Sequence, residues 1–121
     1  MARVYVVDDD PVICRLADYI LRRAGYVVEV WYDGDEALEA LARATPDVIV
    51  TDLMMPRLSG VALIQRIRAT PEWAALPVIV FTARSEVRDR RQAEEAGASL
   101  ILTKPFSSAQ LLEAVKRFAL P

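Results

Sequence analysis

The stretch Asp-Val-Ile-Val-Thr-Asp-Leu-Met-Met-Pro, at residues 47–56, decides the fold of this chain. Residues 48–50 form an unbroken β-branched run, which is typical of a strand buried on both faces of a parallel sheet. Asp52 ends the run, and a short turn closed by Pro56 follows. Open α/β sheets place their ligand chemistry at the carboxyl edge of the strands. We therefore predict a central strand that delivers the Asp52 carboxylate to that edge.

The rest of the chain alternates between strand and helix patterns. Apolar runs predict four further strands, at residues 4–7, 27–32, 77–83 and 99–102. Apolar residues at helical spacing predict five helices, at residues 11–24, 37–42, 61–70, 85–96 and 107–118. Glu29 lies inside the second strand, which favours a position at the edge of the sheet. The alternation predicts an α/β fold, a doubly wound five-stranded parallel sheet with helices on both faces.

Local signals mark several boundaries of these elements. Asp10-Pro11 has the pattern of a helix N-cap followed by the first helical residue. Ser107 and Gln110 have the spacing of a capping box at the start of the last helix. The Asp33-Gly34 pair predicts a turn, and we expect residues 71–77 to form a loop.

Length and composition narrow the classes of function. The 121 residues suit one domain spanning residues 1–121, and the 54% hydrophobic fraction suits a packed core. Fifteen basic and seventeen acidic residues nearly cancel, so no basic face for nucleic acid is expected. The single cysteine, Cys14, lies among apolar helix positions and fits core packing in a reducing cytoplasm. No apolar run reaches membrane-spanning length, and the lack of histidine excludes histidine-based catalysis and metal binding.

Polar residues follow four of the five predicted strands. Asp8 and Asp9 follow the first strand, Asp52 the third, Thr82 ends the fourth and Lys104 follows the fifth. In a parallel sheet these strand ends share one edge, so the side chains converge there. Clustered carboxylates repel one another, and a hard divalent cation such as Mg²⁺ relieves that repulsion through oxygen ligands. The set of side chains suits phosphoryl transfer, which depends on positioning and charge neutralisation.

At these positions the sequence resembles the response-regulator receiver domain of two-component signalling. The matching motifs are Val-Val-Asp-Asp-Asp-Pro at residues 6–11, Asp-Leu-Met-Met-Pro with Leu-Ser-Gly at residues 52–60, Phe-Thr-Ala at residues 81–83 and Lys-Pro-Phe at residues 104–106. The resemblance covers essentially the whole chain, and the order and spacing of the motifs make the joint signal strong. It implies a flavodoxin-like fold with strand order 2-1-3-4-5.

The resemblance also implies a role for each acidic residue. Asp52 is expected to be phosphorylated by a sensor histidine kinase, a phosphotransfer protein or a small acyl phosphate. Asp9 and Asp52 are expected to bind Mg²⁺ directly with the backbone carbonyl of Met54, and Asp8 is expected to hold a water molecule on the ion. The chain would then catalyse only its own phosphorylation and dephosphorylation, and would not be an enzyme in the wider sense.

The resemblance implies that Lys104 and Thr82 carry out the conformational change that follows phosphorylation. Lys104 is expected to pair with a phosphoryl oxygen, and Thr82 to move toward the phosphoryl group. That movement reshapes the surface formed by the fourth helix, fifth strand and fifth helix, which controls a downstream protein or a fused effector domain. A phosphorylation-dependent homodimer is a further expected outcome. No direct contact with nucleic acid or membrane is expected of this chain.

Several positions carry further expectations. The Lys104–Pro105 bond resembles the cis peptide of the family. Ile101 and Leu102 stand where the family often has an aromatic residue, so no aromatic rotamer switch is expected there, and the sequence leaves open whether the backbone and Thr82 alone replace it. Met54 and Arg84 match positions that flank the phosphoryl pocket. We hypothesise that bulky Met54 hinders the attacking water and lengthens the lifetime of the aspartyl phosphate.

Other functions share parts of this pattern. A Mg²⁺-dependent phosphohydrolase with an aspartyl nucleophile shares the acids, Thr82 and Lys104, but such enzymes place a second acid where this chain has Met54. A flavin-binding module needs a Ser/Thr/Gly-rich phosphate loop after the first strand, where this chain has acids. A degenerate receiver acting as a scaffold would not need the complete set of site residues. The sequence leaves open the cognate kinase, the output target and whether the receiver stands alone or fronts a longer protein.

Overall fold

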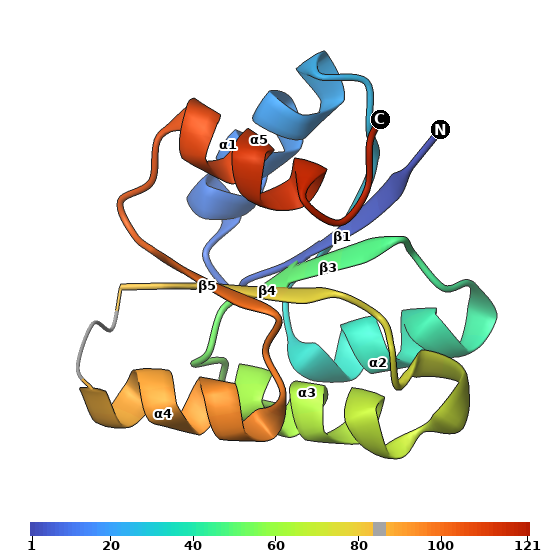
Figure 1. Cartoon of the computed structure of the whole chain (residues 1–121), viewed down its shortest axis with the longest axis vertical. Coiled ribbons are helices and arrows are strands. Elements are labelled where there is room, and N and C mark those ends of the chain that lie inside the picture. Colours follow the sequence, from blue (N-terminus) through green and yellow to red (C-terminus); the bar gives the residue numbers. More distant parts are fainter. Residues whose placement is uncertain (84–86) are drawn as a thin grey trace.

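Five parallel strands form the sheet at the centre of the fold (Figure 1). The computed structural model describes residues 1–83 and 87–121. The strands are β1 (Arg3–Val7), β2 (Val27–Trp31), β3 (Val48–Thr51), β4 (Val78–Thr82) and β5 (Leu100–Thr103). Their order is β2-β1-β3-β4-β5, and each neighbouring pair is parallel. The predicted parallel sheet and the strand order implied by the resemblance are both confirmed.

Helices cover both faces of this sheet. They are α1 (Pro11–Arg23), α2 (Gly34–Arg43), α3 (Gly60–Ala69), α4 (Val87–Ala96) and α5 (Ser108–Lys116). In Figure 1, α1 and α5 lie on one face, and α2, α3 and α4 lie on the other. Within the described ranges, every helix lacks the combination of length and hydrophobicity that crossing a bilayer requires.

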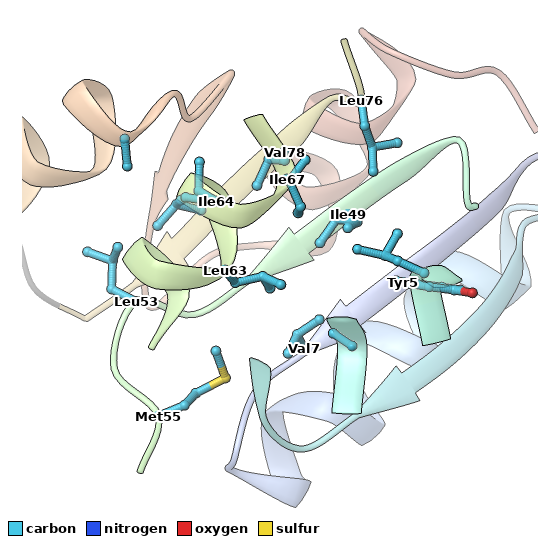
Figure 2. Close-up of a cluster of buried hydrophobic side chains, with 14 of the residues drawn as sticks. Tyr5, Val7, Ile49, Leu53, Met55, Leu63, Ile64, Ile67, Leu76 and Val78 are labelled. Atoms are coloured by element: carbon cyan, nitrogen blue, oxygen red, sulfur yellow. The ribbon is translucent and has the colours of Figure 1, made fainter. Parts of the chain in front are cut away.

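The side chains of the strands alternate between two cores. Val4 and Val6 of β1 pack with α1 and α5, whereas Tyr5 and Val7 pack with α2 and α3 in the core shown in Figure 2. All four residues of β3 are buried because this strand is covered on both faces. The continuous apolar run of the sequence is therefore explained by the central position of β3.

The position predicted for the second strand, at the edge of the sheet, is confirmed. β2 pairs only with β1 in the sheet and carries Glu29. The Glu29 carboxylate accepts a hydrogen bond from Arg3 Nη1 at 2.7 Å, with both side chains partly exposed. A charged residue is tolerated in β2 because the edge of the sheet is open to solvent.

The predicted helix caps are also present. The Asp10 side chain accepts a hydrogen bond from the backbone amide of Val12, and Pro11 is the first residue of α1. Ser107 and Gln110 form a reciprocal capping box at the start of α5. These bonds satisfy amides that a helix start leaves without partners. The Lys104–Pro105 bond is cis, as the resemblance implied.

Two regions differ from the sequence expectations by more than a shift of one or two residues at the end of an element. The expected loop at residues 71–77 contains a short 3₁₀ helix, η1 (Pro71–Trp73), with a proline at its start. α2 begins at Gly34 instead of at Ala37, because Asp33 caps it. α4 begins at Val87 in the described part of the chain, and the expected start at Ser85 lies outside the described residues.

Ile64→Ala is expected to lower the free energy of unfolding by roughly 2–5 kcal/mol, because truncation leaves a cavity in a packed core. Ile64 lies on α3, is fully buried and faces the sheet (Figure 2). Urea unfolding monitored by circular dichroism measures the change. The matched aliphatic truncation Val87→Ala removes a side chain that is 71% exposed and should leave the midpoint nearly unchanged. Similar losses in the two variants would contradict this assignment of the core.

Candidate functional site

The candidate site lies at the carboxyl edge of the sheet, between β1 and β3. From these adjacent strands the chain continues to opposite sides of the sheet, to β2 and to β4. Such a switch point is where open α/β sheets bind their ligands. The Asp52 amide donates to the Val7 carbonyl at 2.9 Å, and the Asp8 amide donates to the Trp31 carbonyl at 3.1 Å. These bonds hold each acid in a fixed register as it leaves its strand.

Three predicted acids come together at this edge. Asp8, Asp9 and Asp52 each contribute a carboxylate oxygen, and these oxygens all lie within 4.8 Å of one another. Asp8 is fully buried, whereas Asp9 is exposed. The cluster therefore has a closed floor at Asp8 and opens toward solvent at Asp9.

Lys104 reaches the cluster from the end of β5. Its Nζ donates to Asp8 Oδ2 at 2.7 Å and lies 3.8 Å from Asp52 Oδ2. The ammonium also lies 5.0 Å from the centre of the Phe81 ring, and the side chain is 15% exposed. The aromatic face and the carboxylates together hold this cation in place. The expectation that Lys104 belongs to the acidic site, and not to the solvated surface, fits this geometry.

Burial and charge shift the pKa values of Asp8 and Asp52. Burial raises the pKa of Asp8, although hydrogen bonds from Lys104 and from the Asp10 amide oppose that shift. Burial is also the main cause that raises the pKa of Asp52 to about 6, and the negative charge of Asp8 adds to it. Lys104 and the Leu53 amide lower the pKa of Asp52 only in part. The cluster thus has a deficit of positive charge.

A hard divalent cation fits this donor set. The three acids provide oxygen ligands at close spacing, and within the described part of the chain Lys104 is the cation that contacts them. Mg²⁺ prefers one or two carboxylates together with water and phosphate oxygens. A positive charge added beside Asp52 would oppose the burial and the Asp8 charge that raise its pKa, and would favour the ionised carboxylate. The acidic cluster is therefore of the kind that binds Mg²⁺.

The remaining predicted residues lie around the cluster. Thr82 is buried at the end of β4, and its carbonyl accepts a hydrogen bond from the Lys104 amide at 2.8 Å. Met54 lies two residues after Asp52 in the loop that leads to α3, and is 55% exposed. Arg84, which sequence reasoning placed beside the phosphoryl pocket, lies outside the described residues.

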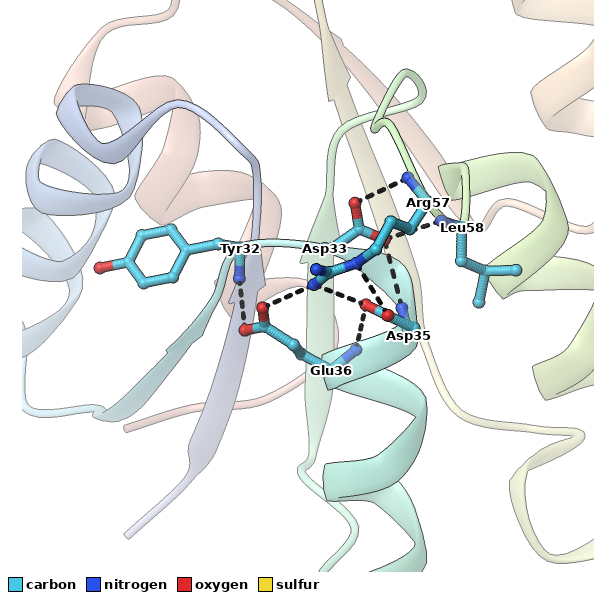
Figure 3. A network of polar contacts seen from close by, with 6 residues as sticks. All are labelled: Tyr32, Asp33, Asp35, Glu36, Arg57 and Leu58. Atoms are coloured by element: carbon cyan, nitrogen blue, oxygen red, sulfur yellow. Dashed lines mark hydrogen bonds and ion pairs between the residues drawn. The ribbon is translucent and has the colours of Figure 1, made fainter.

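The structure adds one element that sequence reasoning missed. Asp33, interpreted above as a turn residue, is buried and accepts backbone hydrogen bonds from Asp35, Arg57 and Leu58 (Figure 3). It therefore joins the start of α2 to the loop that follows Asp52. The Asp33-x-x-Glu36 spacing signals a helix N-terminus, but nothing in it signals a partner more than twenty residues away.

The chain was compared with known protein families and curated relatives. The family model for the response regulator receiver domain matches residues 4–116. The DNA-binding dual master transcriptional regulator RpaA of Synechocystis sp. is 36% identical over 116 residues, which cover 96% of this chain and 48% of RpaA. The response regulator MprA of Mycobacterium ulcerans is 43% identical over 110 residues, covering 91% of this chain and 47% of MprA. The chain thus spans about half the length of these relatives.

Solved structures of related proteins superpose closely on this chain. The chemotaxis protein CheY4 of Vibrio cholerae superposes with a TM-score of 0.92 at 32% identity, covering 98% of this chain and 99% of that one. The receiver domain of the sensor histidine kinase PA1611 from Pseudomonas aeruginosa superposes with a TM-score of 0.91 at 32% identity, covering 97% and 96%. That domain has a magnesium ion coordinated in its active site cleft.

Asp52→Asn is expected to stabilise the metal-free protein near neutral pH. Asp52 ionises near pH 3.8 in the unfolded chain, but its pKa is about 6 in the folded protein. The folded state therefore binds this proton more tightly, and its stability falls as the pH rises from about 4 to about 6. At neutral pH the variant should gain on the order of 1–3 kcal/mol in the free energy of unfolding. Urea unfolding in the presence of a chelator measures it.

The pH dependence of this gain is the control. Below the ordinary pKa of 3.8 the carboxyl is protonated in both states, so the advantage of Asp52→Asn should disappear. Asp18→Asn changes a partly exposed carboxylate that pairs with Arg22 on α1, and should bring no gain at neutral pH. Equal stability of wild type and Asp52→Asn at neutral pH would show that the cluster is not under electrostatic strain.

Proposed function

The chain belongs to the response regulator receiver family, and on that premise we propose that it is a phosphoacceptor switch of a two-component system. Asp52 takes a phosphoryl group from a histidine kinase, a phosphotransfer protein or a small acyl phosphate. The observation that carries this proposal is the cluster of three carboxylates with Lys104 beside two of them. The match over residues 4–116 supports a single receiver domain spanning residues 1–121.

Asp52 supplies the nucleophile of the transfer. A carboxylate oxygen attacks phosphorus and forms an O–P bond, while the bond from phosphorus to the leaving group breaks. The electron pair of that bond goes to the imidazole nitrogen of a phosphohistidine or to the carboxylate oxygen of an acyl phosphate. Asp52 must be ionised to attack, and positive charge close to it lowers its pKa toward that state.

The acids of the cluster also define a cation site. Asp9 and Asp52 would hold Mg²⁺ directly with the backbone carbonyl of Met54, and Asp8 would hold it through a water molecule. Bound there, the ion supplies positive charge that offsets the charge of the phosphoryl oxygens. Asp8 suits an indirect role because its oxygens already accept hydrogen bonds from the Asp10 amide and from Lys104.

Lys104 and Thr82 respond to the phosphoryl group. The Lys104 ammonium lies 3.8 Å from an Asp52 oxygen, which supports its pairing with a phosphoryl oxygen after transfer. The Thr82 hydroxyl donates a hydrogen bond to another phosphoryl oxygen. Thr82 pairs with Thr103 in the register of β4 and β5, so a shift of Thr82 acts directly on the edge strand. The chain catalyses only its own phosphorylation and dephosphorylation in this scheme.

The proposed output surface consists of α4, β5 and α5. A shallow groove of about 190 Å³ lies between β5 and α5. It is lined by Leu100, Ile101, Leu102, Gln110, Glu113, Ala114 and Arg117. A downstream protein, a fused effector domain or a second copy of the chain is proposed to bind here. The aliphatic side chains of β5 suit a switch that acts through the backbone instead of through an aromatic rotamer.

Acetyl phosphate with Mg²⁺ is expected to add one phosphoryl group to wild type and none to Asp52→Asn, because the amide lacks the nucleophilic oxygen. Intact mass and mapping of a base-labile adduct measure it. The matched change Asp18→Asn, in a partly exposed residue paired with Arg22, should keep the label. An adduct that persists in Asp52→Asn would contradict the assignment. Turnover of a phosphate ester without a lasting label would instead favour the phosphohydrolase.

Met54→Asn is expected to shorten the lifetime of the aspartyl phosphate by about tenfold, which corresponds to about 1.4 kcal/mol in the barrier. Met54 is a bulky, half-exposed side chain close to the acceptor, whereas a shorter amide admits and orients the attacking water. Loss of label after removal of acetyl phosphate measures the lifetime. Val12→Asn, an exposed position on α1, serves as the control. An unchanged lifetime in Met54→Asn would refute the role given to Met54.

A further inference from the structure

We propose that Asp33 is a positioning residue for the cation site, because its buried carboxylate fixes the loop that follows Asp52 and carries Met54 against the start of α2. We call residues 53–59, between β3 and α3, the β3–α3 loop. The inference rests on the proposed function, since it concerns the same acidic site. Asp33 itself does not belong to the acidic cluster and reaches the loop from the start of α2, which it caps.

Three backbone amides converge on the Asp33 carboxylate (Figure 3). It accepts hydrogen bonds from the Leu58 amide at 2.7 Å, the Arg57 amide at 3.0 Å and the Asp35 amide at 3.4 Å. Only the last of these bonds is a helix cap. Burial disfavours the charged form, but the amides of Leu58, Arg57 and Asp35 outweigh it and lower the pKa of Asp33. The carboxylate is thus ionised and commits two of its bonds to the loop.

Two glycines show how closely the loop is seated. A Cβ at Gly34 would collide with the carbonyl oxygen of Leu58, so the loop backbone lies directly against the start of α2. A Cβ at Gly60 would collide with the carbonyl oxygen of Asp52, and the Gly60 amide donates to the Leu53 carbonyl at 2.8 Å. The β3–α3 loop is therefore held at its Asp33 end and at its Asp52 end with no room for a side chain at either contact.

Arg57 ties the same loop to α2 from outside. Its guanidinium lies 2.9 Å from an Asp35 oxygen and 3.0 Å from a Glu36 oxygen (Figure 3). The Arg57 side chain is 61% exposed, so these ion pairs contribute less than the buried bonds of Asp33. Reversing the charge of Arg57 would nevertheless repel the loop from both acids.

The position of this loop decides the geometry of the acceptor. The Leu53 amide donates to Asp52 Oδ1 at 2.9 Å, so the first residue of the loop orients the carboxylate. Leu53 and Met55 are buried on either side of Met54, which makes the Met54 backbone move with the loop. Releasing the Asp33 bonds would therefore misplace both the Asp52 carboxylate and the Met54 carbonyl.

Asp33→Ser and Arg57→Glu both weaken the attachment of the β3–α3 loop to α2, but they change the local charge in opposite directions. Asp33→Ser keeps a good helix cap, but the shorter side chain cannot also reach the Arg57 and Leu58 amides. We expect the dissociation constant of Mg²⁺ to rise roughly tenfold, the lower end of the effect of losing outer support at a metal site. Arg57→Glu should raise it in the same direction. Titration of Mg²⁺ followed by amide NMR measures both.

The opposite charge changes of the two variants distinguish an effect of loop position on Mg²⁺ binding from an effect of charge. Asp33→Ser removes a negative charge near the cation site, which weakens Mg²⁺ binding through the field alone. Arg57→Glu makes the region more negative, which strengthens it through the field. A rise in the dissociation constant in both variants supports the proposal, because the field cannot produce it. A rise in Asp33→Ser with a fall in Arg57→Glu, or no change in either, overturns it.

Two matched controls change residues at the amino ends of the strands, away from the acidic cluster. Asp47 accepts a hydrogen bond from the Arg3 amide at 2.7 Å, and Arg3 pairs with Glu29. Asp47→Asn and Arg3→Glu alter a carboxylate that accepts a backbone amide and the arginine of an ion pair, as the test variants do, but away from the acidic cluster, and should leave Mg²⁺ binding unchanged. Equal weakening in these controls would show a general loss of stability and refute the role of Asp33.

A separate measurement isolates the function on which the inference rests. Labelling of wild type by acetyl phosphate tests whether Asp52 accepts phosphate, and it does not depend on Asp33. Wild type that binds Mg²⁺ but takes no label would overturn the proposed function, while the titrations still decide the role of Asp33.

Discussion

The repulsion among three carboxylates at one edge of the sheet is the constraint on which the rest of the structure depends. Asp8, Asp9 and Asp52 are held together by two adjacent strands whose registers are fixed by a buried apolar sheet. The sheet cannot relax to separate them without exposing its two cores. The pKa of Asp52 rises to about 6, mainly because the carboxylate is buried and secondly because of the charge of Asp8. Perturbed carboxylates of this kind mark sites where charge arrives with a ligand.

Groups around the acidic cluster supply a positive charge and a fixed loop, which the three acids do not provide themselves. Lys104 brings a fixed positive charge from the far side of β4, held between Asp8 and the ring of Phe81. Asp33 secures the loop on the other side through backbone amides, at a place where a carboxylate is favoured. One group therefore acts by charge and the other by geometry. The proposed function, in which the site receives a cation and a phosphoryl group, would need both kinds of support.

The fold could be predicted because its signals are local. The β-branched run of β3 and the polar residues after the strands indicate buried parallel strands with a common edge, and the sheet order followed from the resemblance. The Asp33 contact with Leu58 could not be predicted, because it joins residues 25 positions apart through backbone amides that have no sequence signal. The pairing of Lys104 with Asp8 was missed for a related reason. The strand ends fix which side chains converge, but not which oxygen each one contacts.

The unlike edges of the sheet have a consequence for self-association. At β2, Glu29 pairs with Arg3 of the neighbouring strand β1, and this charged pair discourages another chain from adding a strand there. At β5, Leu100, Ile101 and Leu102 are only partly buried and bring no charge. Strand addition and aggregation are therefore favoured at one border of the molecule and disfavoured at the other. A polar residue introduced on β5 would therefore disfavour strand addition at this border as well.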